Sequence, residues 1–502
     1  MQISPRKMVD FHQLQQRLVA LCQDGSDAPV TVVVVPSLTL HPDELKKIPG
    51  AVHFEQRLLF ELQLLRDPRI RLVYVTSRRI DPSIVHYSLN LVAGLSRADA
   101  MARLTVLHCD DDSAEPLTGK ILLRPDVLTR IGAAIADRAR SYLVVFNSTH
   151  LERELAVRLG VPLFACDPEL AGLGTKSGGR RLLRDAGVPV LPGHEDLGSE
   201  EDLVAALARL KTEHPHLRKA VVKLNESFAG AGNAIFSYEG APQKGLAAWI
   251  ADRMADQLTA PGDTWVSFRD KLTVMGGVVE AFLDAQVLRS PSAQLEIEPG
   301  GRVRVLSTHD QVLSGAAGQT FVGCVFPAAD AYRARVRDLA VQAGAALAHA
   351  GVIGQLSIDF VADEAAPEQV YALEINLRMG GATAPFMFTN ALVNGHYDQT
   401  GRYLAPDGSP RHYVTSDRVQ DDAFRSLSCV QLQEIAMRAG QSYQEATRTG
   451  VFFYALGALR DFGKLGVVAV GESREDAQQR YDAAVATLRA VAVLEREHAA
   501  VQ

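Results

Sequence analysis

Three oxygen-bearing side chains in the second half of the sequence could bind a metal ion together. Asp359 lies in the segment 355–361, and Glu374 and Asn376 lie in the segment 371–378. Both segments alternate polar and apolar residues with the two-residue period of a strand, and the polar stretch between them predicts a turn. If that turn is symmetric, Asp359 stands opposite Glu374. Facing carboxylates repel unless a cation separates them, and Mg²⁺ binds such oxygens together with substrate phosphates, so the hairpin predicts a Mg²⁺ site.

Three basic side chains could bind phosphate beside that site. Arg378 follows the oxygen-bearing residues on the same predicted face and could hold a phosphate oxygen through two N–H groups. Lys223 lies near the end of a β-branched run, and the small residues of 226–234 would let backbone N–H groups approach phosphates. Lys176 begins a predicted helix that ends at Gly187. Taken one at a time, these segments are also typical of solvated turns and strand faces, and that alternative stays open for each.

Two common nucleotide-binding motifs nearly match and then fail. A phosphate loop needs glycine before its lysine, but Thr175 precedes Lys176. The dinucleotide fingerprint needs a third glycine, but Ile235 stands in its place. The sequence also contains no H-E-x-x-H zinc helix and no G-x-S-x-G nucleophile motif. These mismatches argue against a P-loop NTPase and a dinucleotide-dependent dehydrogenase.

The composition predicts a soluble enzyme of small molecules. The 502 residues suggest about three domains at about 150 residues each. A net charge of −7 disfavours nucleic-acid binding, and the five cysteines have no C-x-x-C spacing that would suggest a zinc site. No apolar run is long enough to cross a bilayer and no signal peptide is visible, so we expect a cytoplasmic protein without a membrane partner.

The elements that must position these residues fall into three regions. Residues 1–165 alternate short β-rich runs with helical patterns, which predicts an α/β domain with a mostly parallel sheet. The predicted strands are 30–35, 70–75, 104–107, 142–146 and 161–164, and the helices 54–65 and 127–140. Residues 166–395 carry the chemistry. Residues 396–502 predict a helix at 423–438, a hairpin of 451–459 with 465–470, and a last helix from Ser473.

In this order, the segments resemble the ATP-grasp superfamily of carboxylate–amine ligases over about residues 165–395. The resemblance implies an α/β fold of three domains: an N-terminal pre-ATP-grasp domain (1–165), a two-lobed ATP-grasp core (166–395) and a small C-terminal α+β domain (396–502). It also implies roles for individual residues. Lys176 and Lys223 would bind the phosphates of ATP, and Ser227, Gly230 and Gly232 would lie in a loop that closes over the phosphates. Glu280, Ala281 and Leu283 would form a hinge that meets adenine, and Asp359, Glu374 and Asn376 would hold Mg²⁺.

More narrowly, the chain is similar to bacterial peptide ligases of the pheganomycin type. The similarity lies in the segments 223–233, 307–311, 323–328 and 374–381. Two positions depart from the expected patterns. Ser357 stands where some ligases of the superfamily have an arginine that steadies the tetrahedral intermediate, and that role could pass to Arg378. Ala384 stands where the narrower group is expected to have a histidine.

The sequence therefore predicts an ATP-dependent ligase that joins a carboxylate to an amine through an acyl phosphate. Arg378 and Lys223 would neutralise developing charge, and His309 could help to deprotonate the amine. The expected substrates are small molecules, an amino acid or peptide at each end, and the superfamily suggests a possible homodimer. Two alternatives remain at this point: a phosphotransferase that forms no amide, and a non-catalytic protein that senses ATP.

Overall fold

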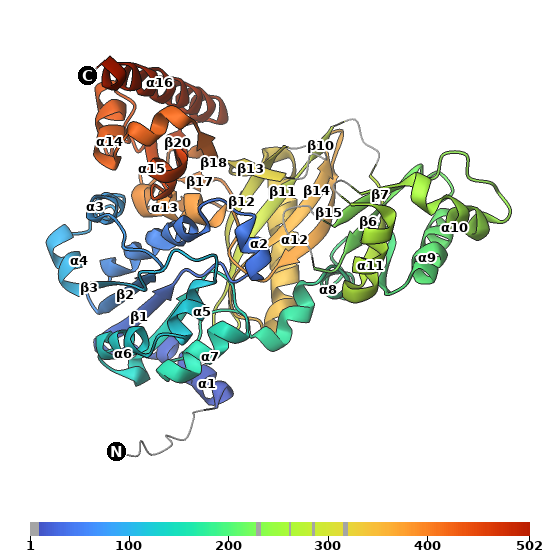
Figure 1. Cartoon of the computed structure of the whole chain (residues 1–502), viewed down its shortest axis with the longest axis horizontal. Helices are drawn as coiled ribbons and strands as arrows, with labels where there is room; N and C mark the ends of the chain where they lie inside the picture. Colours follow the sequence, from blue (N-terminus) through green and yellow to red (C-terminus); the bar gives the residue numbers. More distant parts are fainter. Residues whose placement is uncertain (1–9, 227–231, 261–262, 284–286, 315–319, 502) are drawn as a thin grey trace.

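The structure is a computed structural model of residues 1–502, and it describes residues 10–226, 232–260, 263–283, 287–314 and 320–501. Three large sheets with packed helices form its framework (Figure 1), and a two-stranded ladder of β16 (His396–Tyr397) and β17 (Tyr403–Leu404) completes the sheets of these residues. The predicted α/β class is confirmed. In the described part of the chain, no helix is both long and apolar enough to span a membrane.

The N-terminal sheet consists of four parallel strands in the order β3-β2-β1-β4. The strands are β1 (Val30–Val35), β2 (Ile70–Thr76), β3 (Leu104–His108) and β4 (Ser141–Val145). The residues Val32 to Val35 are fully buried because helices cover both faces of the sheet. These helices include α1 (Phe11–Gln23), α3 (Pro82–Asn90), α4 (Arg97–Arg103), α5 (Leu117–Leu122), α6 (Pro125–Ala134) and α7 (His150–Leu159).

Three predictions for this region need correction. The segment 161–164 is not a strand, because it pairs with β4 only at the bridge between Leu163 and Leu143, and Pro162 has no N–H to extend the ladder. The predicted helix 54–65 is a 3₁₀ helix, η1 (Ala51–Arg66). The predicted helix 127–140 ends at Ala134, where the chain becomes extended.

A five-stranded antiparallel sheet forms the unit at the right of Figure 1. Its order is β5 (Gly193–Leu197), β9 (Gly277–Ala281), β6 (Lys219–Leu224), β7 (Asn233–Ser237) and β8 (Leu258–Thr259). The helices α9 (Glu200–Glu213), α10 (Leu246–Gln257) and α11 (Trp265–Met275) share its apolar core. The helix α8 (Lys176–Asp185) leads into this unit, and the positive φ of Gly187 follows it as predicted.

The central sheet has nine strands among the described residues. Its path is β10 (Leu288–Arg289), β14 (Gly354–Asp363), β11 (Pro291–Ile297), β12 (Val303–Ser314), β13 (Thr320–Phe326), β18 (His412–Gln420), β20 (Lys464–Gly471) and β19 (Gly450–Tyr454), and β15 (Ala366–Asn376) pairs with β14. The helix α12 (Asp330–His349) packs against it. The sheet includes β15, which ends before residue 395, and β18, which begins after it. The predicted domain boundaries at 165 and 395 stay predictions.

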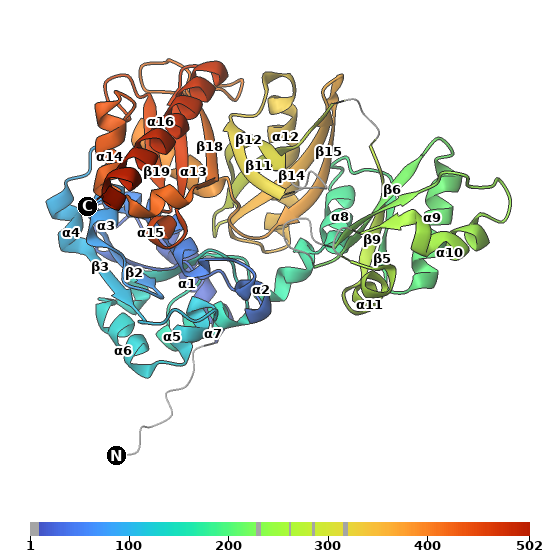
Figure 2. The ribbon, with the colours of Figure 1, turned by 45° about the horizontal axis from the view of Figure 1, so that its top comes forward.

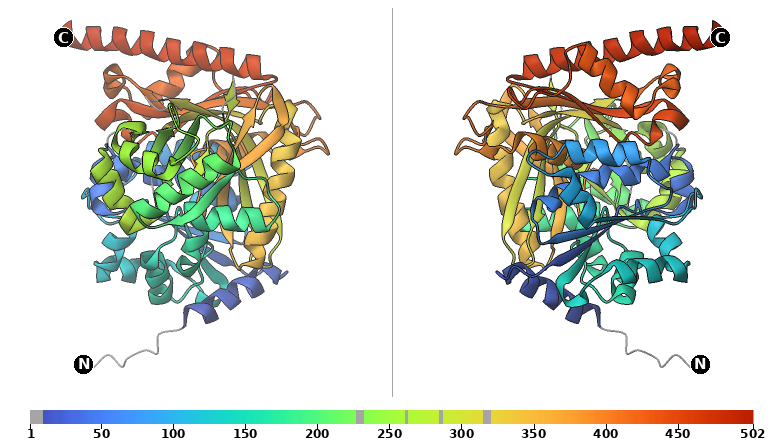
Figure 3. Two further views of the ribbon diagram at one scale, coloured as in Figure 1. Left: turned by 90° about the vertical axis from the view of Figure 1, so that its right-hand side faces the viewer. Right: turned by 90° about the vertical axis from the view of Figure 1, so that its left-hand side faces the viewer.

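The C-terminal region contains the predicted elements in modified form. The helix expected at 423–438 is divided into η4 (Asp422–Ser426) and α14 (Cys429–Arg438), because Ser428 caps the second part. The expected hairpin is β19 with β20, and α15 (Ala458–Phe462) lies in its connection. The last helix is α16 (Arg474–Val501), which runs along one edge of the molecule (Figure 3) and begins where the Ser473 hydroxyl accepts the N–H of Asp476 at 3.1 Å.

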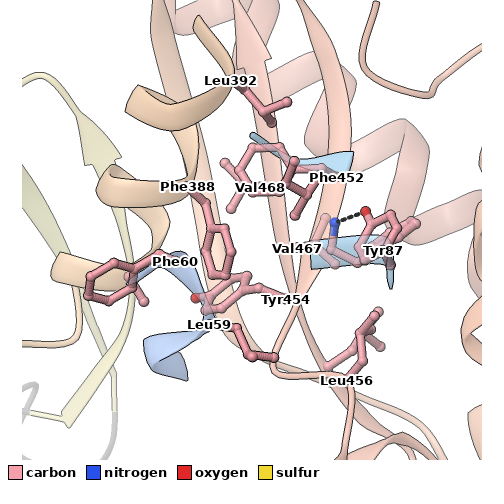
Figure 4. Close-up of a cluster of buried hydrophobic side chains, with 14 of the residues drawn as sticks. Leu59, Phe60, Tyr87, Phe388, Leu392, Phe452, Tyr454, Leu456, Val467 and Val468 are labelled. Atoms are coloured by element: carbon pink, nitrogen blue, oxygen red, sulfur yellow. Dashed lines mark hydrogen bonds between the residues drawn. The ribbon is translucent and has the colours of Figure 1, made fainter. Parts of the chain in front are cut away.

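The N-terminal and C-terminal regions lie side by side and share one apolar core (Figure 2). Figure 4 shows Phe60 of η1 beside Phe388 of α13 (Thr383–Val393), with Phe452 of β19 in the same cluster. The N–H of Phe453 donates to the Tyr87 hydroxyl at 2.9 Å across this core. Because each buried phenylalanine contributes about 2 kcal/mol of hydrophobic stabilisation, the cluster fixes these two regions together.

Candidate active site

The β14–β15 hairpin has the predicted register. Asp359 pairs with Glu374, and Ser357 pairs with Asn376. The alternate residues Ile358 and Ile375 are buried in the core on the other face of the hairpin. The Asn376 amide donates to one Asp359 oxygen at 3.1 Å, which brings the three predicted metal ligands into one cluster.

The charge balance of this cluster favours a bound cation. Burial and the facing charge of Glu374 together raise the pKa of Asp359 to about 7, although Arg378 and Lys176 act in the opposite direction. The Gln311 amide donates to the second Asp359 oxygen at 2.8 Å, but a neutral amide cannot balance a carboxylate. Two carboxylates and an amide oxygen form the hard donor set that Mg²⁺ binds, so the residues present fit that ion.

Lys176 lies against the carboxylate pair from a different element. Thr175 caps α8 by accepting the N–H of Gly178 at 3.0 Å, and this cap fixes Lys176 in the first turn. The Lys176 Nζ atom then lies 2.6 Å from the Glu374 Oε2 atom. The start of α8 is therefore joined directly to β15.

Lys223 is held by a second buried ion cluster. Its Nζ atom lies 2.5 Å from Glu280 Oε2, and the other Glu280 oxygen accepts from Arg180 Nη1 at 2.8 Å. Although burial opposes ionisation of Glu280, Lys223 and Arg180 more than offset that effect and lower its pKa. The Glu280 side chain thus positions two cations, and the predicted contact of the hinge with adenine stays a prediction.

Two positioning residues were missed by sequence reasoning. Arg180 lies four residues after Lys176, so the helical spacing that places both on one side of α8 could have indicated it. Asn225 joins α8 to the end of β6: its carbonyl accepts the Lys176 N–H at 3.3 Å and its side chain accepts the Ser177 N–H at 2.9 Å. This contact sets the spacing between Lys176 and Lys223.

A cavity of about 450 Å³ lies beside the predicted hinge. The hinge residues Ala281 and Leu283 line it, together with Phe282 between them. The remaining lining residues are Leu191, Pro192, His214, His216, Leu217, Arg218, Lys219 and Tyr371. Its volume and its mixture of apolar, aromatic and basic side chains are compatible with a small-molecule site.

The predicted phosphate loop is only partly described. Ser227 and Gly230 lie outside the described residues. Gly232 has a φ of +82°, a conformation that glycine adopts without strain, and its carbonyl accepts the Leu224 N–H at 2.9 Å where the chain returns to β7.

His309 lies in an aromatic core rather than at the reacting centre. Its side chain is fully buried against Phe326 and Phe386, and its Nε2 atom lies 2.7 Å from the Tyr413 hydroxyl. Burial lowers its pKa to about 3, so the ring is neutral. A side chain closed to solvent cannot reach a substrate amine, which corrects the predicted role of His309 in deprotonation.

Arg378 lies between the carboxylate cluster and the N-terminal sheet. Its Nη2 atom donates to the Asn376 side-chain oxygen at 3.2 Å, and its Nη1 atom donates to the Met379 carbonyl at 3.1 Å. The N–H of Met379 donates in turn to the carbonyl of Phe146, at the end of β4. Arg378 therefore lies where the N-terminal sheet meets the central sheet.

The chain belongs to the ATP-grasp family of carboxylate–amine ligases. A family model described as "IQCH-like, ATP-grasp" matches residues 168–239 and 241–400, and the "PGM1 C-terminal domain" model matches 431–484. The predicted ligase activity, which forms a carbon–nitrogen bond, is confirmed over a phosphotransferase and a sensor.

Two named proteins are similar to this chain in sequence. The L-propargylglycine–L-glutamate ligase of Streptantibioticus cattleyicolor is 31% identical over 470 residues, which cover 92% of this chain and 95% of that protein. IQ motif-containing protein H of Danio rerio is 26% identical over 423 residues, which cover 74% of this chain and 40% of that protein. The predicted resemblance to pheganomycin-type peptide ligases is confirmed.

Solved structures of low sequence identity share the fold. The Campylobacter jejuni biotin carboxylase–ATP complex has a TM-score of 0.52 at 14% identity, covering 92% of each chain. The biotin carboxylase domain of Hydrogenobacter thermophilus 2-oxoglutarate carboxylase has a TM-score of 0.53 at 12% identity, covering 90% of this chain and 89% of that one. Together with the family match, this likeness confirms the predicted ATP-grasp fold.

Proposed function

We propose that the enzyme joins the carboxylate of one amino acid or peptide to the amine of another and converts ATP to ADP and phosphate. The observation that carries this proposal is the convergence of the Asp359–Glu374 pair with Lys176 and Arg378 at one place. Such a site can neutralise a phosphoryl group in transfer, which needs mainly positioning and charge. The name of the Streptantibioticus cattleyicolor relative supports amino acids as the substrate class.

ATP would lie between the two antiparallel sheets. The hinge cavity at Ala281 and Leu283 would take the adenine, and Lys176 and Lys223 would contact the phosphates. Both lysines are paired with carboxylates, at 2.6 and 2.5 Å, so each is already directed by a fixed partner. Buried ammonium groups of this kind stabilise developing negative charge because they need little reorganisation.

Asp359, Glu374 and Asn376 would hold Mg²⁺ with the phosphates of ATP. When bound, the ion supplies positive charge to the phosphate oxygens. Burial and the facing carboxylate, which together raise the pKa of Asp359 to about 7, support this assignment because a cation would relieve that repulsion.

The reaction would proceed in two displacements. A carboxylate oxygen attacks the γ-phosphorus, the bond to the ADP oxygen breaks, and ADP leaves. The amine nitrogen of the second substrate then attacks the carbonyl carbon of the acyl phosphate, phosphate leaves, and the nitrogen loses a proton. Arg378 would bind the carboxylate and the tetrahedral oxygen, because it lies beside the cluster and Ser357 offers no charge there.

The test is ADP release from Mg-ATP with pooled amino acids, comparing the wild type with Glu374→Gln. The expected result is release that requires both a carboxylate and an amine substrate and falls at least about 100-fold in the variant. Glu368→Gln is the matched control, since Glu368 is an exposed carboxylate on the same strand. Equal release by Glu374→Gln would contradict the proposed site.

Product analysis separates the reaction from simple phosphorylation. Mass spectrometry should find an amide with the mass of both substrates less one water. A phosphorylated product formed from one substrate would contradict the proposal. The homodimer implied by the superfamily stays a prediction, which light scattering at working concentration can check.

A further inference from the structure

A second cavity, of about 100 Å³, lies behind Arg378 where the N-terminal sheet meets the central sheet. Glu61 of η1 and Glu296 of β11 line it from opposite regions of the chain, and Gln355 of β14 lies with them. Arg378 is also part of its wall, so the cavity begins beside the carboxylate cluster. Its volume suits the end of one side chain rather than a nucleotide.

Glu61 faces this cavity without a partner. Its side chain is only 5% exposed, and it forms no hydrogen bond or ion pair with any residue that the structure describes. Burying a carboxyl group without a hydrogen bond costs stability, so an apolar residue would serve packing better at this position. The retained carboxyl group indicates that something outside the described contacts pairs with it.

Two of the neighbouring polar residues, Glu296 and Gln355, also present acceptor oxygens. Glu296 receives hydrogen bonds from Arg304 and from the Gln355 amide, each at 3.2 Å, and is otherwise buried. That donation turns the Gln355 carbonyl oxygen away from Glu296, and within the described structure this buried oxygen has no hydrogen-bond partner. Two carboxyl groups and an amide oxygen therefore line one small space, and neither Glu61 nor the Gln355 oxygen receives a hydrogen bond from a described residue.

We propose that this cavity binds the positively charged end of an amino acid substrate, with the reacting end of that substrate beside Arg378. This inference rests on the proposed function and names the substrate class of the same site. An ammonium group has three donors and no acceptor, which matches Glu61, Glu296 and Gln355. A substrate carboxylate at this depth would meet the acceptor oxygens of Glu296 and Gln355 and could not replace the ammonium group as their donor, so an acidic side chain is disfavoured.

The raised pKa of Glu61 agrees with a buried carboxyl group that has no cation beside it among the described residues. Burial, together with the charge of Glu296, raises the pKa of Glu61 to about 8. A bound ammonium group would favour the carboxylate and return the pKa downward, so binding would release a proton below about pH 8. The other titratable groups around the cavity are Glu296, Tyr142 and Arg378, with Arg304 and Glu298 beside Glu296.

The direct test is calorimetric binding to the full chain in the presence of Mg²⁺ and a non-hydrolysable ATP analogue. L-Lysine should bind at least about 10-fold more tightly than norleucine, which has the same chain without the ammonium group, and L-glutamate should bind more weakly still. Glu61→Gln and Glu296→Gln should each weaken lysine at least about 10-fold and leave norleucine unchanged. Equal or tighter binding of norleucine or glutamate would overturn the inference.

A matched control and a second readout keep the outcomes separate. Glu298→Gln removes a nearby carboxylate that lies outside the cavity, and it should not change lysine binding. Thermal unfolding at pH 7 checks that Glu61→Gln folds; its carboxyl group is already protonated there, so the amide should be tolerated.

ADP release distinguishes failure of this inference from failure of the proposed function. Release with any acid–amine pair but without a preference for basic substrates would overturn the inference alone. Glu61-dependent lysine binding without amide formation from any pool would contradict the proposed function and leave the binding site standing. If neither amide formation nor Glu61-dependent lysine binding were found, the inference and the proposed function would both be overturned.

Discussion

The Nζ atom of Lys176 lies 2.6 Å from the Oε2 atom of Glu374. A residue expected to bind phosphate therefore neutralises a residue expected to bind metal. Both residues could take these roles when Mg-ATP binds. The Mg²⁺ would then replace Lys176 beside Glu374, and the phosphates would replace Glu374 beside Lys176. The pair thus fixes α8 against β15.

Replacing Lys176 tests that relationship. Lys176→Met should weaken ATP binding and lower ADP release by about 100-fold, because the phosphate loses a fixed cation and Glu374 loses its partner. Calorimetry gives the ATP affinity and a coupled assay gives the rate. Lys46→Met, on the exposed helix α2 (Pro42–Lys46), is the control and should behave as wild type. A Lys176→Met enzyme with unchanged affinity and rate would show that this lysine does not contact ATP.

Removing the charge of Glu280 should destabilise the fold. Glu280→Gln leaves Lys223 and Arg180 without their shared carboxylate in a buried position, which should cost about 3 kcal/mol in the free energy of unfolding. Urea denaturation measures this difference. Glu213→Gln, a half-exposed carboxylate that also pairs with an arginine, should change stability by less than about 1 kcal/mol.

The difference in stability between wild type and Glu280→Gln should depend on pH. The folded pKa of Glu280 is lowered, so its contribution to stability is present above the unfolded pKa, about 4.3, and is lost as pH falls through the folded value. The stability difference between wild type and Glu280→Gln should therefore be constant from pH 5 to 7 and shrink in more acidic solution. A difference that grew on acidification would contradict the assignment of an ionised Glu280.

Glu61, unlike Glu280, should make the folded state less stable as pH rises. Its folded pKa is raised to about 8, so the folded state holds a proton that the unfolded state releases above about pH 4.3. Stability should therefore fall as pH rises between these values in the wild type. Glu61→Gln should remove this loss and melt at a higher temperature than wild type at pH 8, with little difference at pH 4.5. Parallel melting curves at both pH values would contradict the raised pKa.

His309 should affect folding more than catalysis. His309→Phe keeps the aromatic packing and removes the contact with the Tyr413 hydroxyl, so unfolding should become easier by about 1 kcal/mol. The rate constant for ADP release should change less than about twofold, whereas loss of a proton acceptor would lower it at least about 100-fold. Melting temperature and turnover measured on one preparation decide between these outcomes.

The sequence by itself determined the features that depend on local periodicity. Alternation in 355–361 and 371–378 predicted the hairpin and the pairing of Asp359 with Glu374, and the structure has both. The β-branched runs likewise predicted β1 to β4, because a strand buried on both faces must be apolar along its whole length. These patterns are properties of a few neighbouring residues and can be read directly from the chain.

Only the tertiary structure decided which distant residues meet. The pairing of Lys176 with Glu374, the position of Glu280 between Lys223 and Arg180, and the cavity shared by Glu61 and Glu296 join segments far apart in the chain. The burial of His309 depends in the same way on Tyr413, which comes from the last third of the sequence. Such contacts follow from how whole sheets pack, and burial and charge pairing at each contact depend on every element that covers it. Local spacing contains no information about either.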